Sequence, residues 1–182
     1  MNENCHRLIE NLAVPHRAPD AYRTLMRVGR SALTAVRAGL RHESADVRYH
    51  CCRFLDHYLE SGSLSDVLCM LDDIDERVRV STLHTLACDR CKEGSCRPDP
   101  SQVLPQAMKL LAGDSSPHVR AMAVEVVGQF VHAIPEAEAA VVNAARCDPS
   151  TKVRKKAGWY APGGTIYLRT ASRALRRRKR RS

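Results

Sequence analysis

A histidine and three cysteines in the middle of the chain have the spacing of a metal-binding cluster. His84 is followed by Cys88, Cys91 and Cys96, which gives the pattern His-x3-Cys-x2-Cys-x4-Cys. Imidazole nitrogen and thiolate sulfur are ligands that zinc prefers, and four of them leave no position for a catalytic water. The pattern therefore predicts a structural zinc ion, and no other cofactor is expected.

Other interpretations of these cysteines stay open at this stage. They can be reduced thiols in a polar insertion, or Cys88 and Cys91 can form a redox pair, although the βαβ context of a thioredoxin-like motif is missing. His57 and His132 are alternative fourth ligands from neighbouring parts of the chain. Without a secretory signal, the eight cysteines are better explained as thiols or metal ligands than as disulfides.

The C-terminal end is the second feature with chemical potential, because it is strongly basic. Residues 152–182 contain 12 Lys or Arg and no Asp or Glu, whereas the rest of the chain has 17 basic and 20 acidic residues. Arginine-rich segments with interleaved aromatic residues suit phosphate backbones and exposed bases. The expected partner is therefore nucleic acid, DNA or RNA, or a nucleoprotein. The residues expected to bind it are Lys152, Lys155, Lys156, Trp159, Tyr160, Arg169, Arg173, Arg176, Arg177, Arg178, Lys179, Arg180 and Arg181.

This basic end also has competing interpretations. The run 176–181 is entirely basic and cannot bury a core, so residues 165–182 are expected to form a disordered tail. Such a tail can instead serve solubility or bind an acidic protein. Trp159 and Tyr160 can instead cover the open end of the domain.

A repeated helical unit must position these features. The dipeptide Val-Arg occurs four times, and its arginines are 31, 41 and 34 residues apart. Each dipeptide follows a turn and opens an apolar stretch, and this period is typical of stacked helix pairs. The expected fold is all-α, an α-solenoid of about four helix pairs. The expected divisions are N-terminal capping helices at 1–28, a repeat array at 29–164 with a Cys-rich insertion at 88–98, and a tail at 165–182.

The repeat also predicts which residues form the core. Positions three, four and seven residues after each arginine share one helix face and should be buried. They are occupied by Cys51, Thr82, Ala123 and Ala157, by Cys52, Leu83, Val124 and Gly158, and by Leu55, Leu86, Val127 and Ala161.

Six residues before three of the arginines stands an aspartate. This D-x5-R spacing, the preceding Val and the helix-pair period resemble the HEAT repeat, in the short form of small bacterial proteins, over about residues 29–164. The resemblance implies a ladder of Asp–Arg hydrogen bonds between stacked turns. Its pairs on this chain are Asp73 with Arg79, Asp114 with Arg120, and Asp148 with Arg154. The alternative is that these arginines bind phosphate.

The resemblance implies a binding surface rather than a particular activity. Its second helices would line an inner curve, where Arg53, His84, Glu125 and Trp159 form a row of mixed charge that does not suit duplex DNA. Some HEAT proteins are phycobilin lyases or alkylpurine DNA glycosylases, but no catalytic constellation can be placed here. We expect a non-catalytic adaptor for nucleic acid or a nucleoprotein. The alternatives are a zinc-stabilised protein–protein scaffold and a HEAT-type glycosylase or lyase.

The sequence does not favour a membrane partner. No stretch approaches the roughly 20 apolar residues of a membrane span. Charged residues within 1–12 do not fit a signal peptide. A cytoplasmic location is expected.

Overall fold

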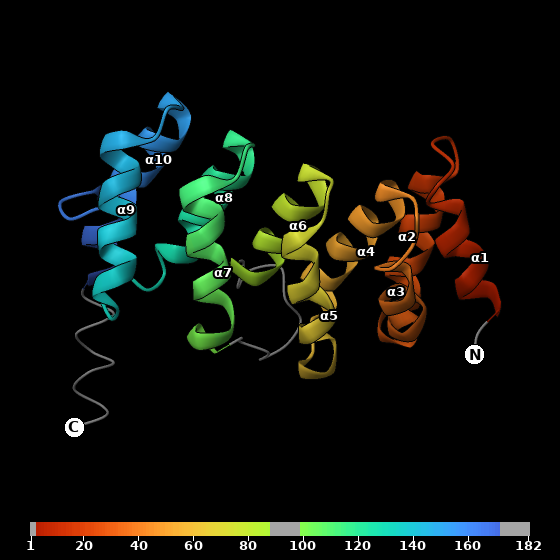
Figure 1. Ribbon diagram of the computed structural model, residues 1–182. Coiled ribbons are helices and arrows are strands. Elements are labelled where there is room, and N and C mark those ends of the chain that lie inside the picture. The colour runs from red at the N-terminus through yellow and green to blue at the C-terminus, as the bar shows by residue number, and fades with distance from the viewer. Residues whose placement is uncertain (1–2, 88–98, 172–182) are drawn as a thin grey trace, which may run out of the picture. The chain divides into compact units, whose positions relative to one another are not determined.

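The computed structural model describes residues 3–87 and 99–171, and within these ranges the regular structure is helical (Figure 1). The chain divides into two compact units, Met1–Pro98 and Asp99–Ser182. This division differs from the single array expected over 29–164. The boundary lies at the end of the expected insertion 88–98, and Cys88, Cys91 and Cys96 lie outside the described residues.

The first unit is a stack of helices in which α4 packs against α2, α3 and α6. Its helix α1 packs against α2 and α3. Three short 3-10 turns connect these helices, and they are η1 (Gly29–Ala32), η2 (Ser61–Ser63) and η3 (Met70–Asp72). The α-helices are α1 (Glu3–Asn11), α2 (Ala18–Val28), α3 (Leu33–Gly39), α4 (Ala45–Tyr58), α5 (Leu64–Cys69) and α6 (Glu76–Ala87).

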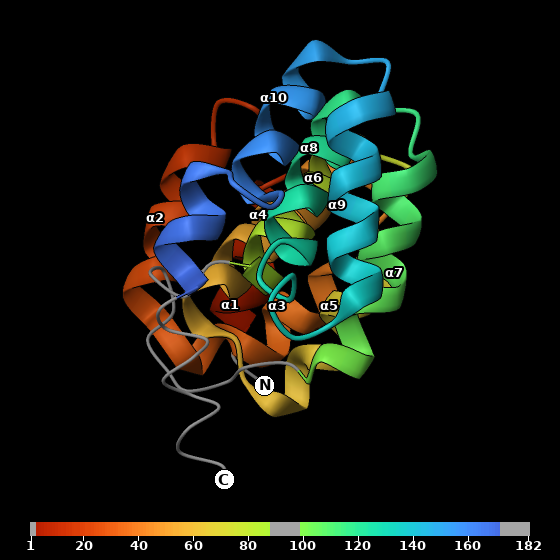
Figure 2. The same ribbon diagram turned by 90° about the vertical axis from the view of Figure 1, so that its left-hand side faces the viewer.

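The second unit contains two helix pairs, in which α7 packs on α8 and α10 packs on both α8 and α9 (Figure 2). Proline stands in the first turn of α7, α8 and α9, where its missing N–H costs nothing. None of the described helices has the length and apolarity to cross a bilayer. The helices are α7 (Pro100–Gly113), α8 (Pro117–Val127), α9 (Pro135–Cys147) and α10 (Thr151–Tyr160).

The core lies where the repeat spacing predicts it, except at the last repeat. The predicted positions in α4, α6 and α8 are all buried, and so is Ala157 in α10. Gly158 is exposed, and Ala161 is only half-buried. The exception has a physical reason, because within the described residues no further helix pair follows α10 to cover this face.

Residues 165–171 correct the expectation of a disordered tail from residue 165 onward. They are helical and are held against α9 and the loop before it. The hydroxyl of Tyr167 donates to Oε2 of Glu138 at 3.2 Å, and its ring centroid lies 4.3 Å from that of His132. Nε2 of His132 lies 2.9 Å from Oγ1 of Thr170. These contacts bury aromatic surface that a solvated tail would expose.

Candidate functional site

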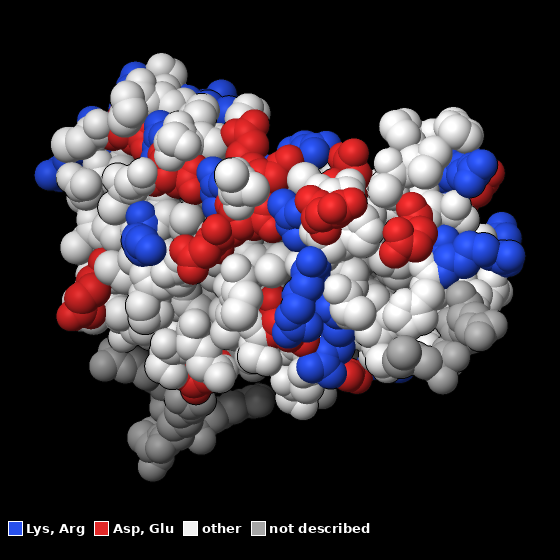
Figure 3. Space-filling model, turned by 45° about the vertical axis from the view of Figure 1, so that its right-hand side comes forward, with Lys and Arg blue, Asp and Glu red and all other residues white. Residues whose placement is uncertain are grey.

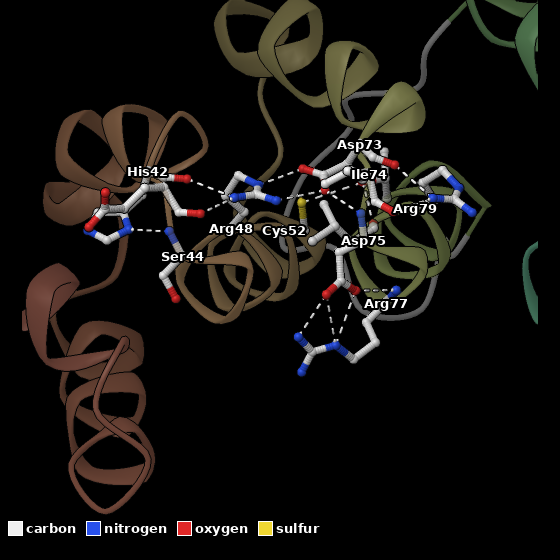
Figure 4. Close-up of polar contacts among 12 residues, drawn as sticks. His42, Ser44, Arg48, Cys52, Asp73, Ile74, Asp75, Arg77 and Arg79 are labelled. Atoms are coloured by element: carbon white, nitrogen blue, oxygen red, sulfur yellow. Dashed lines mark hydrogen bonds and ion pairs between the residues drawn. The ribbon is translucent and has the colours of Figure 1, made fainter.

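The repeated arginines hold the turns of the repeats instead of forming an exposed row. Nη1 of Arg48 donates to the carbonyl oxygens of His42 at 2.9 Å and Glu43 at 2.8 Å (Figure 4). The same two bonds recur in every repeat, from Arg79 to Asp73 and Ile74, from Arg120 to Asp114 and Ser115, and from Arg154 to Asp148 and Pro149. Each arginine therefore satisfies carbonyl groups of its own turn.

Two side-chain rungs of this ladder run from one repeat to the next. Nε and Nη2 of Arg48 donate to Oδ2 and Oδ1 of Asp73 at 2.6 and 2.9 Å. In the second unit, Nε and Nη2 of Arg120 donate to Asp148 in the same way, at 2.8 and 3.0 Å. The expected pairs placed Asp73 with Arg79 and Asp148 with Arg154. The difference arises because a guanidinium has five donors, so one edge bonds its own turn while the other reaches the next repeat.

Asp73 and Asp148 of the ladder are ionised structural groups. Burial alone would raise the pKa of Asp73, but hydrogen bonds from Arg48 and from the backbone N–H of Asp75 outweigh it and lower that pKa. The pKa of Asp148 is lowered in the same way, against the effect of burial, by Arg120 and the backbone N–H of Ser150. These carboxylates neutralise arginine charges that a phosphate-binding row would need.

Helix α10 engages most of its basic side chains inside the second unit. Lys156 forms an ion pair with Glu125, and Nζ of Lys152 lies 3.2 Å from Nδ1 of His118. Lys155 is exposed and has no hydrogen bond or ion pair within the described residues. Figure 3 shows a face on which acidic and basic side chains lie beside one another. The described part of the basic end is thus less available to nucleic acid than its sequence suggests.

The aromatic residues of this end have different roles. The ring of Tyr160 lies so close to Gly128 that a Cβ at that glycine would overlap it. Burial raises the pKa of Tyr160 to about 12. Trp159 is 41% exposed, and Arg169 is also exposed. Tyr160 therefore belongs to the packing of the unit, while Trp159 and Arg169 stay accessible. Arg173, Arg176, Arg177, Arg178, Lys179, Arg180 and Arg181 lie outside the described residues.

A surface pocket of about 240 Å³ lies in the first unit, between α2, α4 and α6. We call it the polar hollow. Three helices contribute its lining, which consists of Tyr22, Arg53, Asp56, His57, Ser81 and His84. Asp56 and Ser81 are buried, whereas Arg53 is exposed. The hollow therefore has buried polar groups in its wall and a cation at its surface.

His84, the expected zinc ligand, belongs to this hollow. Its Nε2 lies 3.4 Å from Oδ2 of Asp56, and its side chain is 45% exposed. The described residues contain no group of three or more side chains arranged to hold a metal ion. The three cysteines of the expected site lie outside the described residues, so the zinc site stays a prediction.

A column of alternating arginine and tyrosine side chains borders the polar hollow. The guanidinium of Arg53 lies 4.6 Å from the ring centroid of Tyr22 and 5.6 Å from that of Tyr49. Arg77 lies 5.9 Å from the Tyr49 ring, and its guanidinium also bonds Asp46 and Asp75. Burial raises the pKa of Tyr22, so this hydroxyl remains a neutral donor at physiological pH.

Part of this site carried a signal in the sequence. Arg53 and His84 occupy the position five residues after the repeat arginine, which the repeat assigned to the inner surface. No sequence pattern marked Tyr22 or Asp56 as part of a site. Tyr22 precedes the first repeat, and Asp56 lies eight residues after Arg48 among apolar neighbours.

The fold and the ladder define a protein of stacked helix pairs. Residues 103–134 match the family model described as the HEAT repeat, so this part of the chain is HEAT-like. This confirms the resemblance and the all-helical repeat fold. Among the curated proteins, none matches the sequence significantly.

Solved structures of designed repeat proteins are similar to the whole fold. One is the designed armadillo repeat protein YIII(Dq.V1)4CPAF in complex with peptide (KR)4, with a TM-score of 0.60 and 19% identity, covering 94% of this chain and 90% of that chain. Another comes from computationally designed armadillo repeat proteins for modular peptide recognition, with a TM-score of 0.58, 19% identity and the same coverage. An engineered protein has a TM-score of 0.54 and 16% identity, covering 87% of this chain and 77% of that chain. At these identities the likeness concerns the fold alone.

Proposed function

We propose that this protein is a non-catalytic adaptor that binds an extended segment of a partner polypeptide on the α2–α4–α6 face of its first unit. The observation that carries the proposal is the polar hollow, to which three helices contribute side chains. Pockets that combine aromatic surface with a few convergent polar groups are typical of ligand sites. The designed armadillo proteins that share the fold include one solved with a bound peptide, which supports a peptide as the ligand.

The chemistry of this face suits an extended peptide. Ser81 and His57 offer hydrogen-bonding groups for peptide backbone. The rings of Tyr22 and Tyr49 offer amphipathic contact area with little rotamer entropy to lose. Tyrosine and arginine are also the residue types that most often dominate binding energy at protein interfaces.

A selection from a library of displayed random octapeptides tests this function. His57→Trp fills the polar hollow with a large side chain, and Thr34→Trp adds the same bulk at an exposed site on α3. We expect peptides selected on the wild-type chain to bind the Thr34 variant normally and to lose binding to the His57 variant. Equal binding to both variants would contradict the proposed face, provided circular dichroism shows that both are folded.

Nucleic acid binding through the C-terminal end is a second candidate function. The exposed positions of Lys155, Trp159 and Arg169, together with the basic composition of 152–182, support it. Binding should be independent of sequence and steeply dependent on salt. Labelled duplex DNA and single-stranded RNA should be titrated with the full chain and with a chain in which residues 176–181 are all serine. The proposal requires the substituted chain to lose most of the binding.

Structural zinc at His84, Cys88, Cys91 and Cys96 also remains a proposal. Zinc-bound histidines usually direct their second ring nitrogen to a carboxylate. The approach of His84 Nε2 to Asp56 is compatible with that arrangement. Such an ion would stabilise the fold and would take no part in chemistry.

A further inference from the structure

We propose that the polar hollow recognises the side-chain carboxylate of an Asp or Glu in the bound peptide, and that Arg53 binds this carboxylate. This inference rests on the proposed peptide-binding function and names the chemistry of the partner. It predicts an acidic partner segment for a protein whose own overall charge is basic.

Arg53 has N–H donors to offer to a ligand. Its guanidinium carbon lies over the rings of Tyr22 and Tyr49, at 4.6 and 5.6 Å from their centroids, and these cation–π contacts use none of its N–H donors in a conventional hydrogen bond. Within the described residues, no carboxylate or carbonyl oxygen accepts a hydrogen bond from Arg53. Its neighbour in the column, Arg77, is in contrast held by Asp46 and Asp75.

The guanidinium of Arg53 is preorganised to bind a carboxylate. A guanidinium presents parallel N–H bonds that match the two oxygens of a carboxylate. Two tyrosine rings restrict the position of this guanidinium, so less conformational entropy is lost when a ligand binds. The same fork already binds carboxylates in this fold, because Arg48 and Arg120 make two bonds each to Asp73 and Asp148.

The cation of the polar hollow lies at its surface and the acidic group lies in its wall. The carboxylate of Asp56 is the acidic group of the hollow, but Asp56 is only 6% exposed and lies beside His84. An entering group therefore meets Arg53 and the imidazoles of His57 and His84 before it meets Asp56. A lysine or arginine of the peptide would face the guanidinium of Arg53 first. The expected preference is thus opposite in charge to the (KR)4 peptide of the designed armadillo complex.

Fluorescence anisotropy with three matched octapeptides tests the inference. The probes are fluorescein-labelled four-fold repeats of Ser-Glu, Ser-Gln and Ser-Lys, titrated against the full wild-type chain. We expect the Ser-Glu peptide to bind tightest. Arg53→Gln should weaken it by roughly tenfold, because charged hydrogen bonds are lost. Arg53→Lys keeps the charge but not the fork, so its loss should be intermediate.

Arg23→Gln is the matched control, because it removes the same charge from α2, where Arg23 is exposed and paired with Asp20. It should change the affinity for the Ser-Glu peptide less than twofold, which shows that the loss of one positive charge from the first unit does not by itself weaken binding. Equal losses in the Arg23 and Arg53 variants, or a preference for Ser-Gln or Ser-Lys, would overturn carboxylate recognition while leaving peptide binding intact. If none of the probes binds and the library selection also fails, the proposed function falls and carboxylate recognition falls with it.

Discussion

Arg48 and Asp73 are joined by two charge-assisted hydrogen bonds of 2.6 and 2.9 Å that connect positions 25 residues apart. Both side chains are largely buried, with 12% and 5% of their surfaces exposed. The pair ties the turn before α4 to the turn before α6, while the other edge of the same guanidinium holds the carbonyl groups of His42 and Glu43. One arginine thus fixes both the shape of its own turn and the spacing to the next repeat.

Removing the carboxylate of this pair should destabilise the first unit. Asp73→Asn leaves a buried guanidinium without its counter-charge, which we expect to cost about 2–4 kcal/mol of unfolding free energy. Native-state hydrogen exchange of the α4 and α6 amides measures this loss. Glu43→Gln removes an exposed charge nearby and should change the value by less than about 0.5 kcal/mol. Similar values for the two variants would mean that the ladder contributes little stability.

The pair of Arg120 and Asp148 should make the unfolding free energy of the second unit depend on pH. The pKa of Asp148 is lowered from its ordinary 3.8, so between the lowered value and 3.8 the unfolded chain binds more protons than the folded one. The stabilisation is therefore complete above about pH 5 and is lost as the pH falls below 3.8. Urea unfolding followed by Trp159 fluorescence from pH 3 to 6 measures it. Asp148→Asn should unfold at lower urea and show a weaker dependence on pH, whereas an unchanged slope would exclude this carboxylate as its source.

Gly128 should be required for the packing of α10. A Cβ at this position would overlap the ring of Tyr160, so Gly128→Ala should destabilise the second unit by about 1–3 kcal/mol. Gly113→Ala is the matched control, because nothing lies within 4 Å of a Cβ there and its φ is not left-handed. That control should be neutral or slightly stabilising. Urea unfolding followed by Trp159 fluorescence distinguishes the two variants, and equal stabilities would contradict the close contact.

The zinc proposal predicts about one equivalent of zinc in the purified full chain, measured by elemental analysis. Cys91→Ser should remove the zinc and lower the melting temperature of the protein. Cys69→Ser changes an exposed thiol outside the cluster and should leave the zinc in place. A chain without zinc whose cluster thiols all react with a thiol reagent would support the interpretation as plain reduced cysteines.

The sequence predicted the helix pairs and most of their core because both follow from local periodicity. Val47, Val78, Val119 and Val153 are all fully buried, as a residue beside a repeated turn arginine should be. Periodicity could not show which arginine each aspartate would pair with. A D-x5-R spacing allows two arrangements. In one, the aspartate carboxylate binds the arginine of its own turn. In the other, that arginine binds the aspartate's backbone carbonyl, and the carboxylate binds the arginine of the previous repeat. Asp73 adopts the second arrangement.

The polar hollow could be predicted only in part, for a physical reason. Arg53 and His84 follow the repeat, so the sequence placed them on the inner surface. The cation–π contact of Arg53 depends on Tyr22, which α2 brings to α4 through tertiary packing that no local pattern encodes. The basic residues of α10 show the converse. Their composition indicated a free cationic surface, but Glu125 lies within reach of Lys156 and pairs with it.

Amide chemical-shift mapping by NMR tests the central claim, a polypeptide site on the α2–α4–α6 face, most directly. The full ¹⁵N-labelled chain would be titrated with the octapeptide that binds tightest in the library selection. The account predicts that the largest shifts fall on Tyr22, Arg53 and Ser81, and that the His57→Trp variant lacks them. Shifts confined to α1, α3 and α5, or to the second unit, would contradict it.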